Sequence, residues 1–206
     1  MMFRLRRDES LLGEALSECA GHLAEAAQQL AAALDSDPEA RTAAVRRLQE
    51  TDRRAEAAAH AVLRGLAASF VTPFDRADIF RLSWAMRRAT ARIDALGDTF
   101  EVLRLGDLPS RTAELVQLVV RATEIIASAV PRLGDPGNVA TSWVDLTVLV
   151  KQAGQLHRRL LLDITTTITE PTLLLRHVEA ATGLRRLIDA VEAVADALQT
   201  VVVTES

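Results

Sequence analysis

Cysteine, tyrosine and aromatic residues in general are scarce in this sequence of 206 residues, and each shortage excludes something. Cys19 is the only cysteine, which excludes an intrachain disulfide framework and a CxxC metal site and fits a reducing compartment. Aromatic residues make up 3% of the chain, whereas hydrophobic residues make up 49%. The interior must therefore be built from alanine, leucine, valine and isoleucine, which favours closely packed helices.

Positive charge and long apolar runs are also in short supply. The net charge is −4 and Lys151 is the sole lysine, so the sequence offers no basic stripe of the kind that nucleic acids require. No stretch reaches the roughly 18 uninterrupted apolar residues of a membrane span, and the start, MMFRLRRDESLL, lacks the apolar segment of a secretory signal. We expect a cytoplasmic protein without nucleic-acid partner or direct membrane insertion, whose attachment to the inner face of the cell membrane would run through a protein partner.

Prolines divide the sequence into long stretches of helical periodicity. Apolar residues recur three, four or seven positions apart, as at Leu12, Leu16 and Leu23, which is typical of helices and not of strands. Asp75, followed three residues later by Asp78, is typical of a capped helix start. The pattern predicts an all-α protein of six long antiparallel helices, at residues 9–34, 38–69, 75–105, 109–132, 138–166 and 170–202.

The helix count predicts two similar halves. We expect an N-terminal three-helix bundle over residues 1–107 and a C-terminal three-helix bundle over 108–206, fused into one helical unit. The β-branched run at 165–169 is a poor helix interior, so we place the turn between the last two helices there.

Catalytic motifs are missing from the chain. There is no GxSxG elbow, Walker-type loop, HExxH or GxGxxG, and no Glu-x-x-His pair of the kind found in di-iron bundles. The sequence therefore predicts a protein that is not an enzyme; the alternative requires a pocket with converging titratable residues that motifs do not reveal. We expect the rare Trp84 and Trp143 to pack in the core or at helix crossings rather than to stack on a ligand.

One acidic row could carry metal chemistry. Asp52, Glu56 and His60 lie four residues apart and so project from the same face of the second helix. Carboxylate oxygens suit Mg²⁺, Mn²⁺ or iron, and His60 could add a nitrogen ligand. The alternative is an ordinary solvated helix face, since Arg53 and Arg54 lie alongside.

The segment FVTPFDRADIF at 70–80, between two long helices, resembles the signature turn of the PhoU-like phosphate-transport regulators, specifically the accessory proteins of low-affinity inorganic phosphate transporters. The resemblance extends through MMFRLRRDES at the start, QLHRRLL at 155–161 and AVADALQTVVVTES at the end. It implies a six-helix fold of two three-helix bundles, no enzymatic activity, and paired acidic motifs that hold multinuclear metal clusters on the bundle surface.

The four acidic pairs of the family are only partly kept in this chain. Placed position by position, they fall on Asp52 and Glu56, Arg87 and Ala91, Val150 and Gly154, and Arg185 and Asp189. A remnant of three carboxylates beside guanidinium groups is a poor ligand set for a cation. The chain therefore resembles a divergent member with degenerate metal motifs, and we expect Arg87 to stand in for the metal against Asp52 and Glu56, while Arg185 pairs with Asp189.

Three functions follow, in order of preference. The first is a non-enzymatic accessory protein without cofactor, which docks to a low-affinity phosphate transporter or a related signalling protein. The second is a metal sensor in which one weak site for a divalent ion or iron survives on Asp52, Glu56, His60 and Asp189. The third is a helical scaffold or oligomerisation protein. Exposed leucine and valine stripes predict a homodimer or a helical partner.

Overall fold

The computed structural model describes residues 2–34, 38–69, 72, 74–105 and 108–203. Six long α-helices and one short 3₁₀ helix make up this part of the chain, and it contains no strand. The predicted all-α class with six helices is therefore confirmed. The elements are α1 (Met2–Leu34), α2 (Pro38–Ala68), α3 (Arg76–Val102), α4 (Ser110–Ala129), η1 (Val130–Arg132), α5 (Pro136–Thr167) and α6 (Pro171–Val203).

Two helix starts differ from the predicted ones by more than one residue. The helix α1 begins at Met2, seven residues before the predicted start. The helix α5 begins at Pro136, because Asp135 caps it by accepting a hydrogen bond from the Asn138 amide at 3.2 Å, and a proline is tolerated in the first turn. The predicted cap of α3 is confirmed, since Asp75 Oδ1 accepts from the Ala77 amide at 2.7 Å.

The end of α5 corrects the expected turn at 165–169. The helix continues through Thr167, and the hydroxyl groups of three threonines donate to the carbonyls four residues back. These are Thr165 to Leu161 at 2.9 Å, Thr166 to Leu162 at 2.8 Å and Thr167 to Asp163 at 2.6 Å. Helical hydrogen bonding of the hydroxyls outweighs the low propensity of β-branched residues, so the turn comes only at 168–170.

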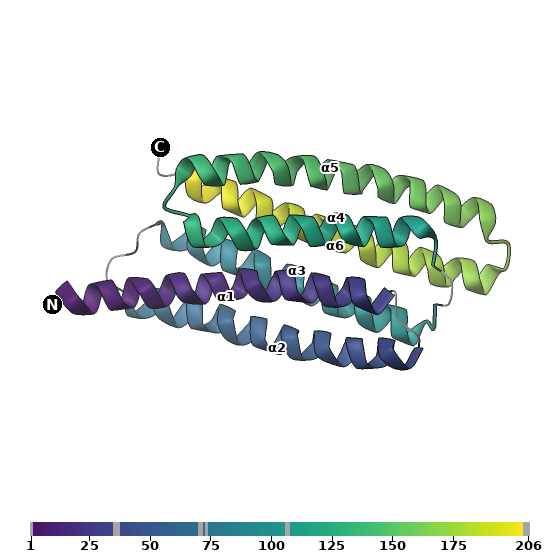
Figure 1. Cartoon of the computed structure of the whole chain (residues 1–206), viewed down its shortest axis with the longest axis horizontal. Helices are drawn as coiled ribbons and strands as arrows, with labels where there is room; N and C mark the ends of the chain where they lie inside the picture. The colour runs from purple at the N-terminus through teal and green to yellow at the C-terminus, as the bar shows by residue number, and fades with distance from the viewer. Residues whose placement is uncertain (1, 35–37, 70–71, 73, 106–107, 204–206) are drawn as a thin grey trace.

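The helices lie side by side in four layers, as Figure 1 shows. The helix α2 forms one outer layer and α5 the other, while α1 with α3 and α4 with α6 form the two inner layers. The halves meet where α1 packs on α4 and α3 packs on α6. One continuous core of buried aliphatic side chains runs through both halves.

Two glycines bring α3 close to its neighbours on both sides. A Cβ atom on Gly97 would lie 2.6 Å from Cδ1 of Leu48 on α2, and one on Gly183 of α6 would lie 2.9 Å from Cδ1 of Leu96 on α3. Leucine side chains fill the space that the missing Cβ atoms leave. This close packing fixes the register of α2 and α6 against α3.

None of the helices in the described part of the chain combines the length and the apolar character that a membrane span requires.

Candidate functional site

The predicted arginine bridge between α2 and α3 is present. Arg87 Nη1 donates to Asp52 Oδ1 at 2.7 Å and Arg87 Nη2 donates to Asp52 Oδ2 at 3.1 Å, a two-pronged pairing. Each side chain is only 17% exposed, so the pair is largely shielded from water. The prediction that Arg87 faces this carboxylate is therefore confirmed.

Glu56 completes the bridge more loosely. Its Oε2 lies 4.0 Å from Arg87 Nη2, and the side chain is 55% exposed. One guanidinium thus lies between two carboxylates one helical turn apart and offsets their mutual repulsion. His60, one turn further along α2, is exposed, and Asp189 lies on α6.

The candidate ligands do not converge on one point in the described part of the chain. Both oxygens of Asp52 are occupied by Arg87, and no three His, Cys, Asp or Glu side chains of the described residues converge as metal ligands. Neither His60 nor Asp189 joins Asp52 and Glu56 in such a group. The donor set therefore does not fit the multinuclear cluster that the resemblance implies.

Asp94 is a further charged residue in this region, and motif reading missed it. It lies on α3 seven residues after Arg87, and its Oδ1 is buried without a hydrogen-bond partner among the described residues. Its pKa is raised to about 6, first by burial and then by the nearby charges of Asp52 and Asp98. The charge of Arg87 opposes this shift only in part. Burial and the neighbouring carboxylates thus disfavour the charged form of Asp94.

Gln49 extends the contact between these two helices. Its Nε2 donates to Asp98 Oδ1 at 3.2 Å across the same pair of helices. Gln49, Asp52 and Glu56 on α2 therefore face Arg87, Asp94 and Asp98 on α3, and we call these six residues the α2–α3 seam. A spacing of three, four or seven residues along each helix was the signal that could have found Asp94 and Asp98.

The second half has no counterpart of this seam. Arg185 pairs with Asp189 one turn along its own helix, as predicted. On α5, a Cβ atom added to Gly154 would lie 3.5 Å from Arg185 Nη1, so the guanidinium passes over a position without a side chain. Both members of the pair are exposed, at 40% for Arg185 and 52% for Asp189.

Two histidines and the single cysteine are buried in the fold. His157 and His177 are buried, and a ring nitrogen of each lies near a backbone carbonyl, at 2.8 Å from Ala181 O and 2.9 Å from Leu173 O. Burial raises the pKa of Cys19 to about 12, which keeps the thiol protonated. These three side chains are therefore packing residues.

Trp84 contradicts the expected core role. It is 48% exposed and lies beside Phe80, itself 43% exposed, with ring centres 6.2 Å apart and planes inclined by 16°. The two rings stand one turn apart on the surface of α3. Trp143, by contrast, is partly buried against the core, as expected.

Comparison with known proteins gives a match in structure alone. No family model matches the chain, and no curated protein sequence matches it either. A PhoU-like protein from Shewanella oneidensis MR-1 superposes with a TM-score of 0.81 at 13% identity, over 93% of this chain and 99% of that one. A second protein from this organism, described as a candidate PhoU-like phosphate regulatory protein, gives 0.79 at 12% identity, over 94% and 96%. The chain thus has the PhoU-like fold that the resemblance predicted.

Proposed function

We propose that this protein is a non-catalytic regulator of phosphate homeostasis that acts by docking to a partner. The partner would be a low-affinity phosphate transporter or a signalling protein that controls one, met in the cytoplasm or at the inner face of the cell membrane. The observation that carries the proposal is the structural likeness to a protein described as a candidate PhoU-like phosphate regulator, over 94% of this chain and 96% of that one. The likeness concerns the whole architecture rather than a single helical hairpin.

A docking role also agrees with the chemistry of the described residues. A ring nitrogen of each of the two buried histidines lies near a backbone carbonyl. The buried thiol of Cys19 stays protonated because burial raises its pKa. The principal charged constellation, Asp52 with Arg87, is an internal ion pair with no site for a reacting group between its members. Neither arrangement supplies the activated nucleophile and base that catalysis requires.

The test is deletion of the gene from its host, followed by measurement of radiolabelled phosphate uptake over a range of external phosphate concentrations. We expect the deletion strain to lose the normal adjustment of uptake to phosphate supply, and a plasmid copy of the gene to restore it. Uptake that follows the same curve in both strains would contradict the proposal.

We further propose that the protein works without a metal because Arg87 supplies the positive charge that an ion would otherwise supply. Elemental analysis of the purified protein should find magnesium, manganese, iron and zinc far below one ion per chain. The matched variant, Arg87→Glu with Ala91→Asp, restores a second acidic pair opposite Asp52 and Glu56 and should acquire a divalent ion. A stoichiometric metal in the unaltered protein would overturn this part of the proposal.

Self-association stays a prediction. Exposed leucines near the turn between α5 and α6 provide apolar surface for it, namely Leu162, Leu173 and Leu175. Light scattering at micromolar concentration measures the oligomeric state directly.

A further inference from the structure

A long groove runs along the surface where the two halves meet at α3 and α6. It has a volume of about 660 Å³, and its lining extends from Ala77 to Arg92 on α3 and from Arg186 to Thr200 on α6. At 1.5 Å per residue each stretch is roughly 20 Å long, about four helical turns. A groove of these proportions matches a helix better than a compact ligand.

Small side chains keep the groove open. Five alanines line it, two on α3 and three on α6: Ala77, Ala85, Ala190, Ala193 and Ala197. With only Cβ atoms at these positions, the backbone of a further helix can approach to the 8–10 Å that is usual between packed helices.

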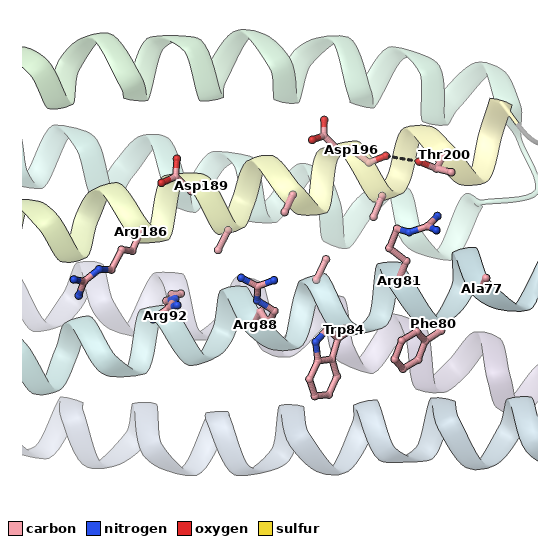
Figure 2. A pocket seen from close by; sticks show the side chains of 14 residues that line it. Ala77, Phe80, Arg81, Trp84, Arg88, Arg92, Arg186, Asp189, Asp196 and Thr200 are labelled. Atoms are coloured by element: carbon pink, nitrogen blue, oxygen red, sulfur yellow. Dashed lines mark hydrogen bonds between the residues drawn. The ribbon is translucent and has the colours of Figure 1, made fainter.

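The charge of the groove is opposite to that of the chain. Four arginines and two aspartates line it, giving a local excess of two positive charges in a protein of net charge −4. Two of these arginines are paired with carboxylates outside the groove lining, Arg81 with Asp78 at 2.5 Å and Arg186 with Glu179 at 3.7 Å. Arg88 and Arg92 form no ion pair with any residue that the structure describes. In Figure 2 the two aspartates, Asp189 and Asp196, point away from α3. Two guanidinium groups one helical turn apart are therefore available to carboxylates of a partner.

The α3 wall of the groove carries two aromatic rings. Figure 2 shows Phe80 and Trp84 side by side on the flank of α3 that lies away from α6, with Arg88 one turn beyond Trp84 and its guanidinium group directed toward α6. Tryptophan and arginine are among the side chains that most often dominate the binding energy of protein interfaces. The α3 wall of the groove thus combines the apolar rings of Phe80 and Trp84 with the guanidinium groups of Arg88 and Arg92.

We propose that this groove docks an acidic amphipathic helix of the partner protein. Apolar side chains of that helix cover Phe80 and Trp84, and two of its carboxylates, four residues apart, pair with Arg88 and Arg92. The inference rests on the proposed docking function and names the surface and the partner chemistry that it uses.

The probe is a designed helical peptide of 18 residues with leucines along one edge and glutamates four residues apart beside them. Its binding is followed by fluorescence anisotropy of a terminal label and by the emission of Trp84 in a Trp143→Phe background. We expect saturable binding that falls at least tenfold in an Arg88→Glu/Arg92→Glu variant and in Trp84→Ala. The reversed variant should instead bind a peptide in which lysines replace the glutamates.

The control is Arg46→Glu/Arg47→Glu, which reverses two exposed arginines on α2 outside the groove and should bind as the unaltered protein does. Circular dichroism verifies that every variant keeps its helices. Absence of binding, or equal binding by the Arg88→Glu/Arg92→Glu variant, would overturn the proposal. Equal binding of a peptide whose leucines are replaced by serine, or of inorganic polyphosphate, would also overturn it, since the surface would then be a general polyanion site.

The same variants separate this inference from the proposed function. If the gene deletion alters phosphate uptake but the Arg88→Glu/Arg92→Glu protein restores it fully, the groove is not the docking surface, although the regulatory role stands. If deletion has no effect on uptake while the peptide still binds through these arginines, the regulatory role is wrong and the groove serves another partner.

Discussion

In the first half of the molecule an arginine joins two helices, whereas in the second half the corresponding arginine stays on its own helix. Arg87 spans from α3 to Asp52 on α2, with both side chains 17% exposed. Arg185 pairs with Asp189 on α6, at 40% and 52% exposure, and passes over Gly154 on α5.

The different pairing of the two arginines follows from the residue that the neighbouring helix presents to each of them. Where α2 presents a carboxylate, the guanidinium crosses over and becomes shielded from water. Where α5 presents glycine, there is nothing to bind, and the guanidinium turns to the nearest carboxylate one turn away. Removal of one member of a shielded ion pair leaves the other charge uncompensated, which lowers stability. An exposed ion pair contributes little to stability. The two halves should therefore respond unequally to the same substitution.

Replacement of Arg87 should have the largest effect. Arg87→Met keeps the aliphatic stem but leaves Asp52 without its partner, and we expect the free energy of unfolding to fall by about 2 kcal/mol, below the value for a fully buried pair. Urea denaturation at neutral pH measures it.

Two further variants make this first comparison quantitative. Arg185→Met should cost less than about 0.5 kcal/mol, because its pair is exposed. Asp52→Asn added to Arg87→Met should recover part of the loss, since it removes the unpaired charge. Equal losses for Arg87→Met and Arg185→Met would mean that the two halves do not differ in the way their exposures indicate.

Asp94 gives the second prediction, which concerns pH. Its pKa of about 6 in the folded state lies above the ordinary value of 3.8, so the folded state binds a proton more tightly. Stability should therefore fall as the pH rises from about 4 to about 6, and stay reduced above that. Asp94→Asn lacks this loss, and we expect it to be more stable than the unaltered protein by about 1 kcal/mol at pH 7.5, after allowance for solvent screening.

The measurement is urea denaturation of both proteins between pH 4 and pH 7.5. The gain should disappear at the acid end, where the Asp94 carboxyl is protonated in the folded state. Asp163→Asn in the second half is the control and should not show the same gain, because Arg111 pairs with that carboxylate. Parallel curves for Asp94→Asn and the unaltered protein would refute the prediction.

The helices could be predicted from the sequence because they depend on local spacing, whereas the arginine bridge also required the family resemblance. A 3.6-residue period fixes which residues share a helix face, so Asp52 and Glu56 had to project together, and the family resemblance placed Arg87 opposite them. The opposite charges of Arg87 and Asp52 then favoured the contact between these two side chains.

The partial burial of Asp94 and the exposure of Trp84 could not be predicted, since both depend on which faces of α3 the helices α2 and α6 cover. Rare aromatic residues favour a core position on average, but α6 packs on α3 along its alanines and leaves Trp84 at the edge of the groove. The end of α5 was predicted to within one residue, but the turn after it was placed too early, because hydroxyl groups can bond to the helix that their branching disfavours.

The smallest expected effect comes from giving the second half the carboxylate that it lacks. A Cβ atom at position 154 fits without a clash, at 3.5 Å from Arg185 Nη1 and 3.9 Å from Arg158 Nη1, so Gly154→Asp should place an acidic group among these guanidinium groups. Any residue other than glycine or proline raises helix propensity there, and Gly154→Asn is therefore the reference that isolates charge. We expect Gly154→Asp to exceed Gly154→Asn by about 0.5 kcal/mol, and Arg185→Gln to remove most of that difference in a double-mutant cycle. High salt should weaken the gain, because the side chain of Arg185 is 40% exposed. If the difference between Gly154→Asp and Gly154→Asn survives Arg185→Gln unchanged, Arg185 keeps its pairing with Asp189 even when a carboxylate faces it from α5. The contrast between the halves would then arise from helix geometry rather than from the side chain that is missing at position 154.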